Sequence, residues 1–305
     1  MLMFSADQIG FESPYKVPSL LSKDEKAMYY WVAKTHYKNR GQVVEIGPWL
    51  GSGTLQICRG LQETGKLWHL HILDRFTWTS HYESRYPELE LKDGESFLPL
   101  LKSHLKDYGS DMTFHTGDLS HIEDVFPLTE KIEILYVDAP KSWKMLWIVL
   151  AHLGPKLMPG AQLVFQDFFH ITSRQLIWLL ASIPQFELKQ IVQVGTAAHF
   201  ETDGPVPDIS KIAPRDFKTL REPELNKIWN SVCRSMPEDR AGEMTVGIAL
   251  DLIRIGALGR ARKLVEESVG QNDKKKNILV QIRRLIRDED LSQDRALKQV
   301  IDWLT

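Results

Sequence analysis

The sequence predicts an α/β domain with a mostly parallel sheet, followed by a region that contains only helices. Short runs of β-branched residues alternate with helical patterns between residues 22 and 202. Several of these runs end in an acidic residue, as strands often do at the ligand-binding edge of such sheets. After a proline-rich stretch at residues 203–222, only the helical pattern continues.

The first elements can be placed from local signals. Residues 1–20 are expected to be an irregular lead-in, because Pro14 and Pro18 interrupt regular structure. Ser22 and Glu25 have the spacing of a helix capping box, which predicts a helix over residues 22–38. The periodicity then predicts strands at 42–46, 67–73, 112–115, 132–137 and 162–165, with helices at 53–63, 94–108, 142–157 and 172–183.

The end of the α/β domain is expected to be antiparallel. Residues 186–194 and 197–201, separated by a Gly-Thr pair, predict two paired strands that close the edge of the sheet. We therefore expect a lead-in at 1–20, an α/β domain at 21–205 and a helical C-terminal region at 206–305. In that last region the pattern predicts helices at 223–235, 240–255, 258–269, 274–287 and 292–304.

Composition limits the classes of protein that the chain can represent. Of its 305 residues, 43% are hydrophobic and 26% charged, which is typical of a globular protein with a real core. A formal net charge of −2 gives no reason to expect nucleic acid or an anionic membrane as a partner. No apolar run is long enough to span a membrane and no secretory signal is expected. Two distant cysteines, with Cys58 on an apolar helix face, predict a reduced thiol and a cytoplasmic protein.

One stretch has the pattern of a ligand-binding turn. In residues 43–54 a β-branched run reaches Glu45, and Gly47 and Gly51 then mark a turn that leads into an amphipathic helix. Such a turn presents backbone N–H groups at a helix N-terminus, beside a carboxylate at a strand end. The simpler alternative is an ordinary strand–turn–helix, in which the glycines only supply unusual backbone angles.

Four acids, Glu45, Asp74, Asp118 and Asp138, end or follow predicted strands of the α/β domain. In a parallel sheet the carboxyl ends of the strands share one edge, so these side chains are expected to converge there. Their order along the chain, together with the glycine turn, is difficult to attribute to chance. The acids therefore favour a ligand site at this edge.

The ordered set resembles that of the class I S-adenosylmethionine-dependent methyltransferases over residues 20–202. The resemblance lies in Glu-x-Gly-x-x-x-Gly at residues 45–51, the acids Asp74, Asp118 and Asp138, and Pro159-Gly160. The wider pattern Glu-Ile-Gly-x-x-x-Gly-x-x-Thr, which ends at Thr54, looks like the branch of macrocin-type sugar O-methyltransferases. The resemblance implies a Rossmann-like, seven-stranded sheet with helices on both faces. It also implies O-methylation of a sugar, glycoside or similar small molecule, with S-adenosyl-L-methionine as cofactor.

The resemblance also implies cofactor-binding roles. Gly47 and Gly51 would let the backbone approach the methionine part of the cofactor, and Asp74 would accept hydrogen bonds from the ribose hydroxyls. Asp118 would lie near the adenine amino group, unless it only caps the helical turn that follows it. Glu45 is expected to hold the loop through backbone N–H groups. The whole cofactor-binding set is Glu45, Gly47, Gly51, Thr54, Asp74, Asp118 and Asp138.

The macrocin-type branch uses a divalent metal, whose ligands would here be Asp138, Gln166 and Asp167. Gln166 departs from the carboxylate pattern, and a neutral amide is a weaker ligand for Mg²⁺ than a carboxylate. Lys141 adds a positive charge in the turn after the fourth strand. Mg²⁺ therefore stays an open alternative at this point.

A route without metal needs a base for the hydroxyl proton of the acceptor. His170 is the first candidate, with Asp167 to orient it, and Asp138 is the second. Lys141 would stabilise the developing alkoxide. These four residues form the expected catalytic set. A last group of residues has two possible roles, as a platform for a sugar ring or as part of the core: Trp78, Tyr82 and Trp143.

Two other functions compete with an active methyltransferase. One is a catalytically silent module of this fold that holds a ligand while its C-terminal helices dock a protein partner or a second copy. The other is a nicotinamide oxidoreductase, which the glycine spacing disfavours because the turn lacks Gly-x-Gly-x-x-Gly. The basic residues between Lys274 and Arg287 are interpreted as a solvated face, with an acidic partner as the alternative.

Overall fold

The computed structural model describes most of the α/β region and part of the C-terminal region. The described residues are 2–83, 85–127, 129–170, 175–216, 219, 223, 248–253 and 255–269. The chain divides into two compact units. The first comprises Met1–Pro140, Ile148–Gln166 and Gln185–Asp208, and the second Lys141–Trp147, Asp167–Pro184 and Ile209–Thr305.

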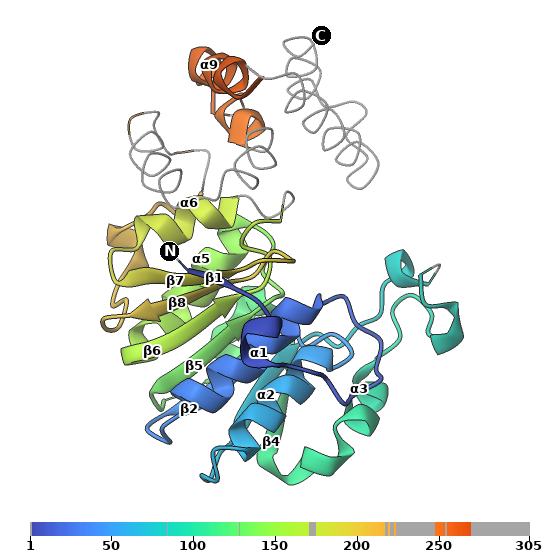
Figure 1. Ribbon diagram of the computed structural model, residues 1–305. Coiled ribbons are helices and arrows are strands. Elements are labelled where there is room, and N and C mark those ends of the chain that lie inside the picture. The colour runs from blue at the N-terminus through green and yellow to red at the C-terminus, as the bar shows by residue number, and fades with distance from the viewer. Residues whose placement is uncertain are drawn as a thin grey trace. The chain divides into compact units, whose positions relative to one another are not determined.

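The first unit contains an eight-stranded sheet with the order β1-β7-β8-β6-β5-β2-β3-β4 (Figure 1). All neighbouring strands are parallel, except that β8 runs antiparallel to both β6 and β7. The strands are β1 (Leu2–Phe4), β2 (Gln42–Ile46), β3 (Leu70–Asp74), β4 (Met112–Thr116), β5 (Ile132–Val137), β6 (Leu157–Phe165), β7 (Phe186–Val192) and β8 (Ala198–Thr202). The predicted α/β class is confirmed.

The eighth strand corrects two expectations. Residues 2–4, expected to be irregular, form β1 and pair in parallel with β7, with Leu2 opposite Gln190. Phe4 is buried in the core. Three apolar residues are too few to show a two-residue period, so only the tertiary pairing reveals this strand. The β7–β8 pair therefore does not close the sheet, because β8 lies between β6 and β7 and β1 forms the edge.

Strand β6 is longer than predicted. The Pro159-Gly160 turn expected before the strand lies inside it, and Gly160 has a φ of 77°. The register with β5 shifts at this place, since Ile132 pairs with Leu157 but Ile134 pairs with Gln162. A glycine with positive φ allows the local irregularity without ending the strand.

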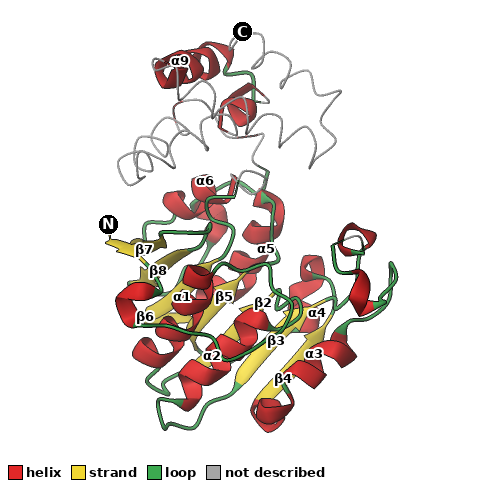
Figure 2. Cartoon of the chain, turned by 45° about the vertical axis from the view of Figure 1, so that its right-hand side comes forward, coloured by secondary structure: helices red, strands yellow, loops and turns green. Residues whose placement is uncertain are grey.

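Helices alternate with the strands along the chain (Figure 2). The α-helices with given bounds are α1 (Lys23–His36), α2 (Ser52–Gln62), α3 (Leu98–His104), α4 (Ile122–Val125), α5 (Trp143–Leu153), α6 (Gln175–Ser182) and α9 (Leu258–Val269). The helix α9 was predicted at its observed bounds. Of the other C-terminal helices, the one predicted at 240–255 is described as helical at residues 248–253. The helix at 223–235 (except Pro223), those at 274–287 and 292–304, and the basic residues from Lys274 to Arg287 lie outside the described residues.

Helix α1 begins with the predicted capping box. The Glu25 backbone N–H donates to Ser22 Oγ at 3.2 Å, and the Ser22 backbone N–H donates to Glu25 Oε2 at 2.7 Å. Helices α1 and α2 pack against each other on one face of the sheet (Figure 1). Their approach is close at Gly60, where a Cβ atom would lie 2.5 Å from the carbonyl oxygen of Tyr30.

The start of β5 is fixed by a buried carboxylate. The Glu133 side chain is 1% exposed and accepts backbone N–H bonds from Lys38 at 2.8 Å, Arg40 at 2.7 Å and Gly41 at 3.3 Å. The turn between α1 and β2 is therefore tied to β5. Among the described helices, none has the length and apolar character needed to cross a membrane.

Candidate functional site

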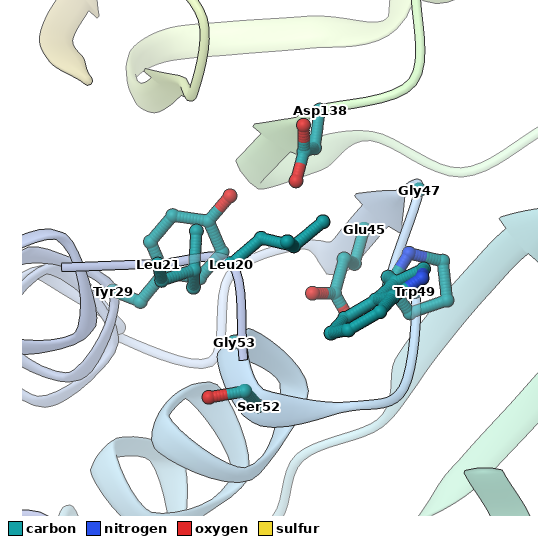
Figure 3. Close-up of a pocket in the computed structure, with 10 residues that line it drawn as sticks. Leu20, Leu21, Tyr29, Glu45, Gly47, Trp49, Ser52, Gly53 and Asp138 are labelled. Carbon is teal, nitrogen blue, oxygen red and sulfur yellow. The ribbon is translucent and has the colours of Figure 1, made fainter. Parts of the chain in front are cut away.

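The first unit has an open pocket at the carboxyl ends of β2 and β5 (Figure 3). It measures about 310 Å³ including its open mouth, and is lined by Leu20, Leu21, Tyr29, Glu45, Gly47, Pro48, Trp49, Ser52, Gly53 and Asp138. The carboxylates of Glu45 and Asp138 and the hydroxyl of Tyr29 face a common space. Three residues of the predicted cofactor set, Glu45, Gly47 and Asp138, thus line one pocket.

The loop that forms the floor of the pocket depends on its glycines. Gly47 and Gly51 have φ values of 83° and 88°, in the left-handed region that favours glycine. A Cβ atom on Gly47 would lie 2.6 Å from the backbone nitrogen of Ala139, and one on Gly51 would lie 2.6 Å from Leu101. Both glycines are therefore required by the packing of the protein itself. Their predicted contact with the cofactor stays a prediction.

Glu45 is buried, with 2% of its surface exposed. Its Oε2 accepts a hydrogen bond from Thr54 Oγ1 at 2.7 Å, so the hydroxyl of Thr54 holds it in place of the expected backbone N–H groups. Burial raises the pKa of the Glu45 carboxyl to about 8, against the lowering effect of the Thr54 bond, and the charges of Asp138 and Asp74 raise it further. Thr54 therefore positions Glu45 from the first turn of α2.

Asp74 lies at the end of β3, as predicted, and its carboxylate is oriented by the backbone. Oδ1 accepts a hydrogen bond from the Phe76 N–H at 2.7 Å. Burial raises the pKa of Asp74 to about 6, and the charge of Asp138 also raises it. Strand β3, which Asp74 ends, and strand β5, which Asp138 follows, pair with β2 on its two sides, so the three acids lie at neighbouring strand ends. Three of the four predicted acids converge.

Asp118 has a different environment. Its Oδ1 accepts the backbone N–H of Ser120 at 2.8 Å, capping the short helical turn Leu119–His121, and its Oδ2 lies 3.9 Å from Arg75 Nη1. The hydrogen bonds from Ser120 lower the pKa of Asp118, and the charge of Arg75 adds to this effect. The capping role considered from the sequence is confirmed, and contact with an adenine ring stays a prediction.

An aromatic cluster lies beside the pocket. Trp49 lines it with a positive φ of 46°, and its ring stacks on Trp78 at 6.3 Å with 17° between the planes. Tyr86 lies 5.0 Å from Trp49 between ring centroids. Trp78 is 1% exposed and belongs to the core, as does Trp143, whose Nε1 donates to the Pro214 carbonyl at 2.8 Å in the second unit. Of the two roles considered from the sequence, the role in the core is therefore the one that these two residues have.

The comparisons with known proteins decide the family of this site. Residues 44–168 match the family model described as a methyltransferase domain. This stretch is a methyltransferase domain. The predicted resemblance to a methyltransferase is confirmed over this stretch, and with it an enzyme that transfers methyl groups.

Solved structures of methyltransferases resemble this chain in part. The O-methyltransferase NovP is 13% identical, with 58% of this chain and 77% of that one covered and a TM-score of 0.44. Cofactor-bound Rv0187 from MTB is 14% identical over 62% and 84%, with a TM-score of 0.46. The O-methyltransferase TomG from Streptomyces achromogenes is 16% identical over 60% and 82%, with a TM-score of 0.45. No curated protein matches the sequence.

The predicted catalytic residues of the methyltransferase fall in both units. Asp138 lines the pocket of the first unit. Lys141, Asp167 and His170 belong to the second, where Lys141 Nζ forms an ion pair with Asp167 Oδ2. His170 is exposed, and its backbone N–H donates to the Asp167 carbonyl at 3.1 Å. The Asp167 carboxylate thus pairs with Lys141, and the catalytic role of His170 stays a prediction.

The predicted metal ligands do not fit a divalent cation. The carboxylate of Asp167 forms an ion pair with the ammonium group of Lys141, and Gln166 offers only a neutral amide oxygen. Hard cations such as Mg²⁺ favour several carboxylate oxygens. Within the described parts of the chain, no group of three or more His, Cys, Asp or Glu side chains has the arrangement of a metal site. The expectation of Mg²⁺ at Asp138, Gln166 and Asp167 is not supported.

The acids in and beside the pocket do fit a cationic organic cofactor. Glu45 and Asp138 line the pocket, and Asp74 lies close enough to raise the pKa of Glu45. The buried Nε1 of Trp49 has no hydrogen-bond partner among the described residues, so one donor at the pocket wall is available to a ligand. S-adenosylmethionine carries a sulfonium and an ammonium group, which match an excess of carboxylates.

Sequence reasoning missed most of the apolar wall of this pocket. Leu20 and Leu21 come from the segment before α1, and Tyr29 comes from α1 itself. A hydrophobic residue directly before a capping serine is a recognised signal for packing at a helix start, so Leu21 had a detectable pattern. The participation of Tyr29 depends on how α1 packs on α2, which local patterns do not specify.

Proposed function

We propose that the protein is an S-adenosylmethionine-dependent O-methyltransferase that acts on a hydroxyl of a sugar, glycoside or similar small molecule. The observation that carries the cofactor half is the pocket that Glu45 and Asp138 line at the carboxyl edge of the sheet, with Asp74 at the end of the neighbouring strand β3. The hydroxyl acceptor is supported by the sequence pattern of residues 45–54 and 134–168, which resembles that of the macrocin-type branch.

In this proposal each acid has a separate task. The two oxygens of Asp74 bind the two ribose hydroxyls, which are vicinal donors, while Phe76 fixes the orientation of the carboxylate. Asp138 balances the positive charge of the cofactor, and Glu45 adds to this balance when it releases its proton on cofactor binding. Gly47 and Gly51 hold the loop in the shape that leaves this space open.

When bound, S-adenosylmethionine would supply an electrophilic methyl group for the acceptor oxygen. The protein must then receive the proton of the acceptor hydroxyl. We assign this task to His170, with Asp138 as the alternative base. Lys141 is the positive charge nearest to Asp138 along the chain and is proposed to stabilise the oxygen as it loses its proton.

The remaining properties belong to the same proposal. We propose a cytoplasmic enzyme, because Cys58 is a buried free thiol, and a small-molecule acceptor in preference to nucleic acid. Contacts with another copy or a protein partner through the C-terminal helices are part of the proposal. A silent binding module is not favoured, because the family model that residues 44–168 match is that of a methyltransferase domain.

Binding calorimetry tests the cofactor site directly. S-adenosylmethionine and S-adenosylhomocysteine should both bind the full chain, and binding of neither would refute the proposal. Asp74→Asn keeps an oxygen for the Phe76 N–H but loses the charge-assisted pair to the ribose, so the Kd should rise about 10- to 100-fold. Asp203→Ala, at an exposed acid, is the control and should leave the Kd unchanged. A glycan and small-molecule panel with radiolabelled methyl donor then tests the acceptor class.

A further inference from the structure

The ion pair of Lys141 and Asp167 connects two segments that leave neighbouring strands. Lys141 follows the end of β5 at Val137, and Asp167 follows the end of β6 at Phe165. The two strands are parallel, with Val137 opposite Phe165. Both segments therefore start from the sheet edge where open α/β folds bind their ligands.

The segments after β5 and β6 carry fewer negative charges and one more positive charge than the metal site of the resembled branch. Gln166, where the resembled branch has an acid, is 5% exposed, and its Oε1 has no hydrogen-bond partner among the described residues. The side chain of Asp167 is 17% exposed and that of Lys141 is 45% exposed, so Asp167 is the more buried partner of an ion pair that is open to solvent on its lysine side. One negative charge is missing and one positive charge is added. Either change, the neutral Gln166 or the added Lys141, would weaken a divalent metal site. Together they put the positive charge of an ammonium group where the resembled branch has that of a metal ion.

We propose that the ammonium of Lys141 takes the place of a divalent metal ion beside Asp167, and that methyl transfer by this protein needs no metal. The inference rests on the proposed function, because it assumes that the segments after β5 and β6 serve the acceptor. Asp167 acts as a positioning residue that holds the ammonium group. Lys141 supplies a fixed positive charge for the oxygen of the acceptor, whose proton passes to a base of the protein.

Direct binding of Mn²⁺, followed by electron paramagnetic resonance, tests the proposal without an acceptor. The wild-type protein should bind no Mn²⁺ at about 1 mM concentration or below, on the order of the weakest protein sites for such ions. The double variant Lys141→Ala, Gln166→Asp removes the ammonium and restores a carboxylate, so it should bind Mn²⁺ at least tenfold more tightly. The matched control is Lys144→Ala, Gln166→Asp, which removes an exposed lysine nearby and keeps Lys141.

The outcomes separate the two proposals. Mn²⁺ binding by the wild-type protein, or equal binding by both double variants, would overturn the assignment of Lys141. The same holds if the Lys141 double variant binds no Mn²⁺ while its thermal unfolding and its affinity for S-adenosylmethionine match those of the control. Should that variant fail to fold, methyl transfer decides: EDTA treatment should leave transfer by the wild type unchanged, and Lys141→Met should lower it. Transfer that EDTA abolishes in the wild type, or that Lys141→Met leaves unchanged, contradicts the inference. Absence of cofactor binding in the wild type would instead refute the proposed function.

Discussion

Replacing Glu45 by glutamine tests the electrostatic state of the cofactor pocket. The buried carboxyl accepts a hydrogen bond from Thr54, and the amide oxygen of glutamine can accept the same bond. The substitution is nearly isosteric, so packing should change little. What it removes is the ability of residue 45 to ionise, and the pH dependence of folding should change accordingly.

The sign follows from the two pKa values. In the unfolded chain the Glu45 carboxyl ionises near its ordinary pKa of 4.5, whereas burial raises the pKa to about 8 in the fold. Between these values the native state binds more protons than the unfolded state, so stability falls as pH rises. At about 1.36 kcal/mol per pKa unit, the loss reaches about 5 kcal/mol above pH 8. Glu45→Gln should lack this loss, and its stability should exceed that of the wild type at high pH.

Urea unfolding at a series of pH values measures the difference. The two proteins should agree within about 0.5 kcal/mol at about pH 4.5 and differ by several kcal/mol at about pH 8.5. Asp203→Asn, at an exposed acid, controls for the general effect of removing one negative charge. A constant difference between wild type and Glu45→Gln across this range would refute the assignment of a neutral, buried Glu45. Calorimetry in buffers of different ionisation enthalpy should also show proton release when the cationic cofactor binds to the wild type near neutral pH, and less release in Glu45→Gln.

Three further predictions concern the scaffold. Gly60→Ala places a Cβ 2.5 Å from the Tyr30 carbonyl oxygen and should destabilise the fold by about 1–3 kcal/mol in urea unfolding, whereas Gly259→Ala, where the space is open, should not destabilise it. Glu133→Gln turns an amide group toward backbone N–H donors and should lower the free energy of unfolding by about 2–4 kcal/mol. An unchanged midpoint of unfolding would contradict the role of this carboxylate. Burial, with the charges of His69 and His115, lowers the pKa of His71 to about 4, so stability should fall as pH drops below 6.5, and thermal melts of His71→Gln should show a smaller fall.

Elements with strong local patterns were predicted at their observed bounds. The strands Gln42–Ile46 and Ile132–Val137 are buried runs between clear breaks, so the sequence alone specifies them. The helix predicted at 94–108 instead starts at Leu98 and is followed by a 3-10 helix at Lys106–Asp111. Pro99 lies in its first turn, where proline is favoured, and this signal could have placed the start. The strand Leu2–Phe4 depends on pairing with a distant segment, and no local pattern indicates it.

For the site, the sequence likewise predicted where the acidic residues lie better than it predicted which residues they contact. The order of strands and acids predicted that Glu45, Asp74 and Asp138 meet at one edge. The cap that Asp118 forms with Ser120 was among the roles considered, but the contact of Asp118 with Arg75 could not be predicted, because it depends on the path of two loops. The positive φ of Trp49 is equally invisible in sequence, since such conformations are uncommon outside glycine. Burial and partners, rather than residue type, therefore separate Asp118, which caps a helical turn, from the acids at the ends of β2, β3 and β5.

The excess of carboxylates has a consequence for the direction of the reaction. S-adenosylmethionine carries one positive charge more than S-adenosylhomocysteine, because methyl transfer converts the sulfonium to a neutral thioether. A pocket in which Glu45 and Asp138 face the ligand, with Asp74 near them, favours the donor over the product by Coulomb attraction in a partly buried site. The charge of the pocket then promotes exchange of spent cofactor for fresh donor. Because Glu45→Gln removes a group that can release its proton when the cationic donor binds, the preference for the donor, measured as the ratio of the product's Kd to the donor's Kd, should fall in that variant, whereas a site that recognised only the adenosine part would keep the ratio unchanged.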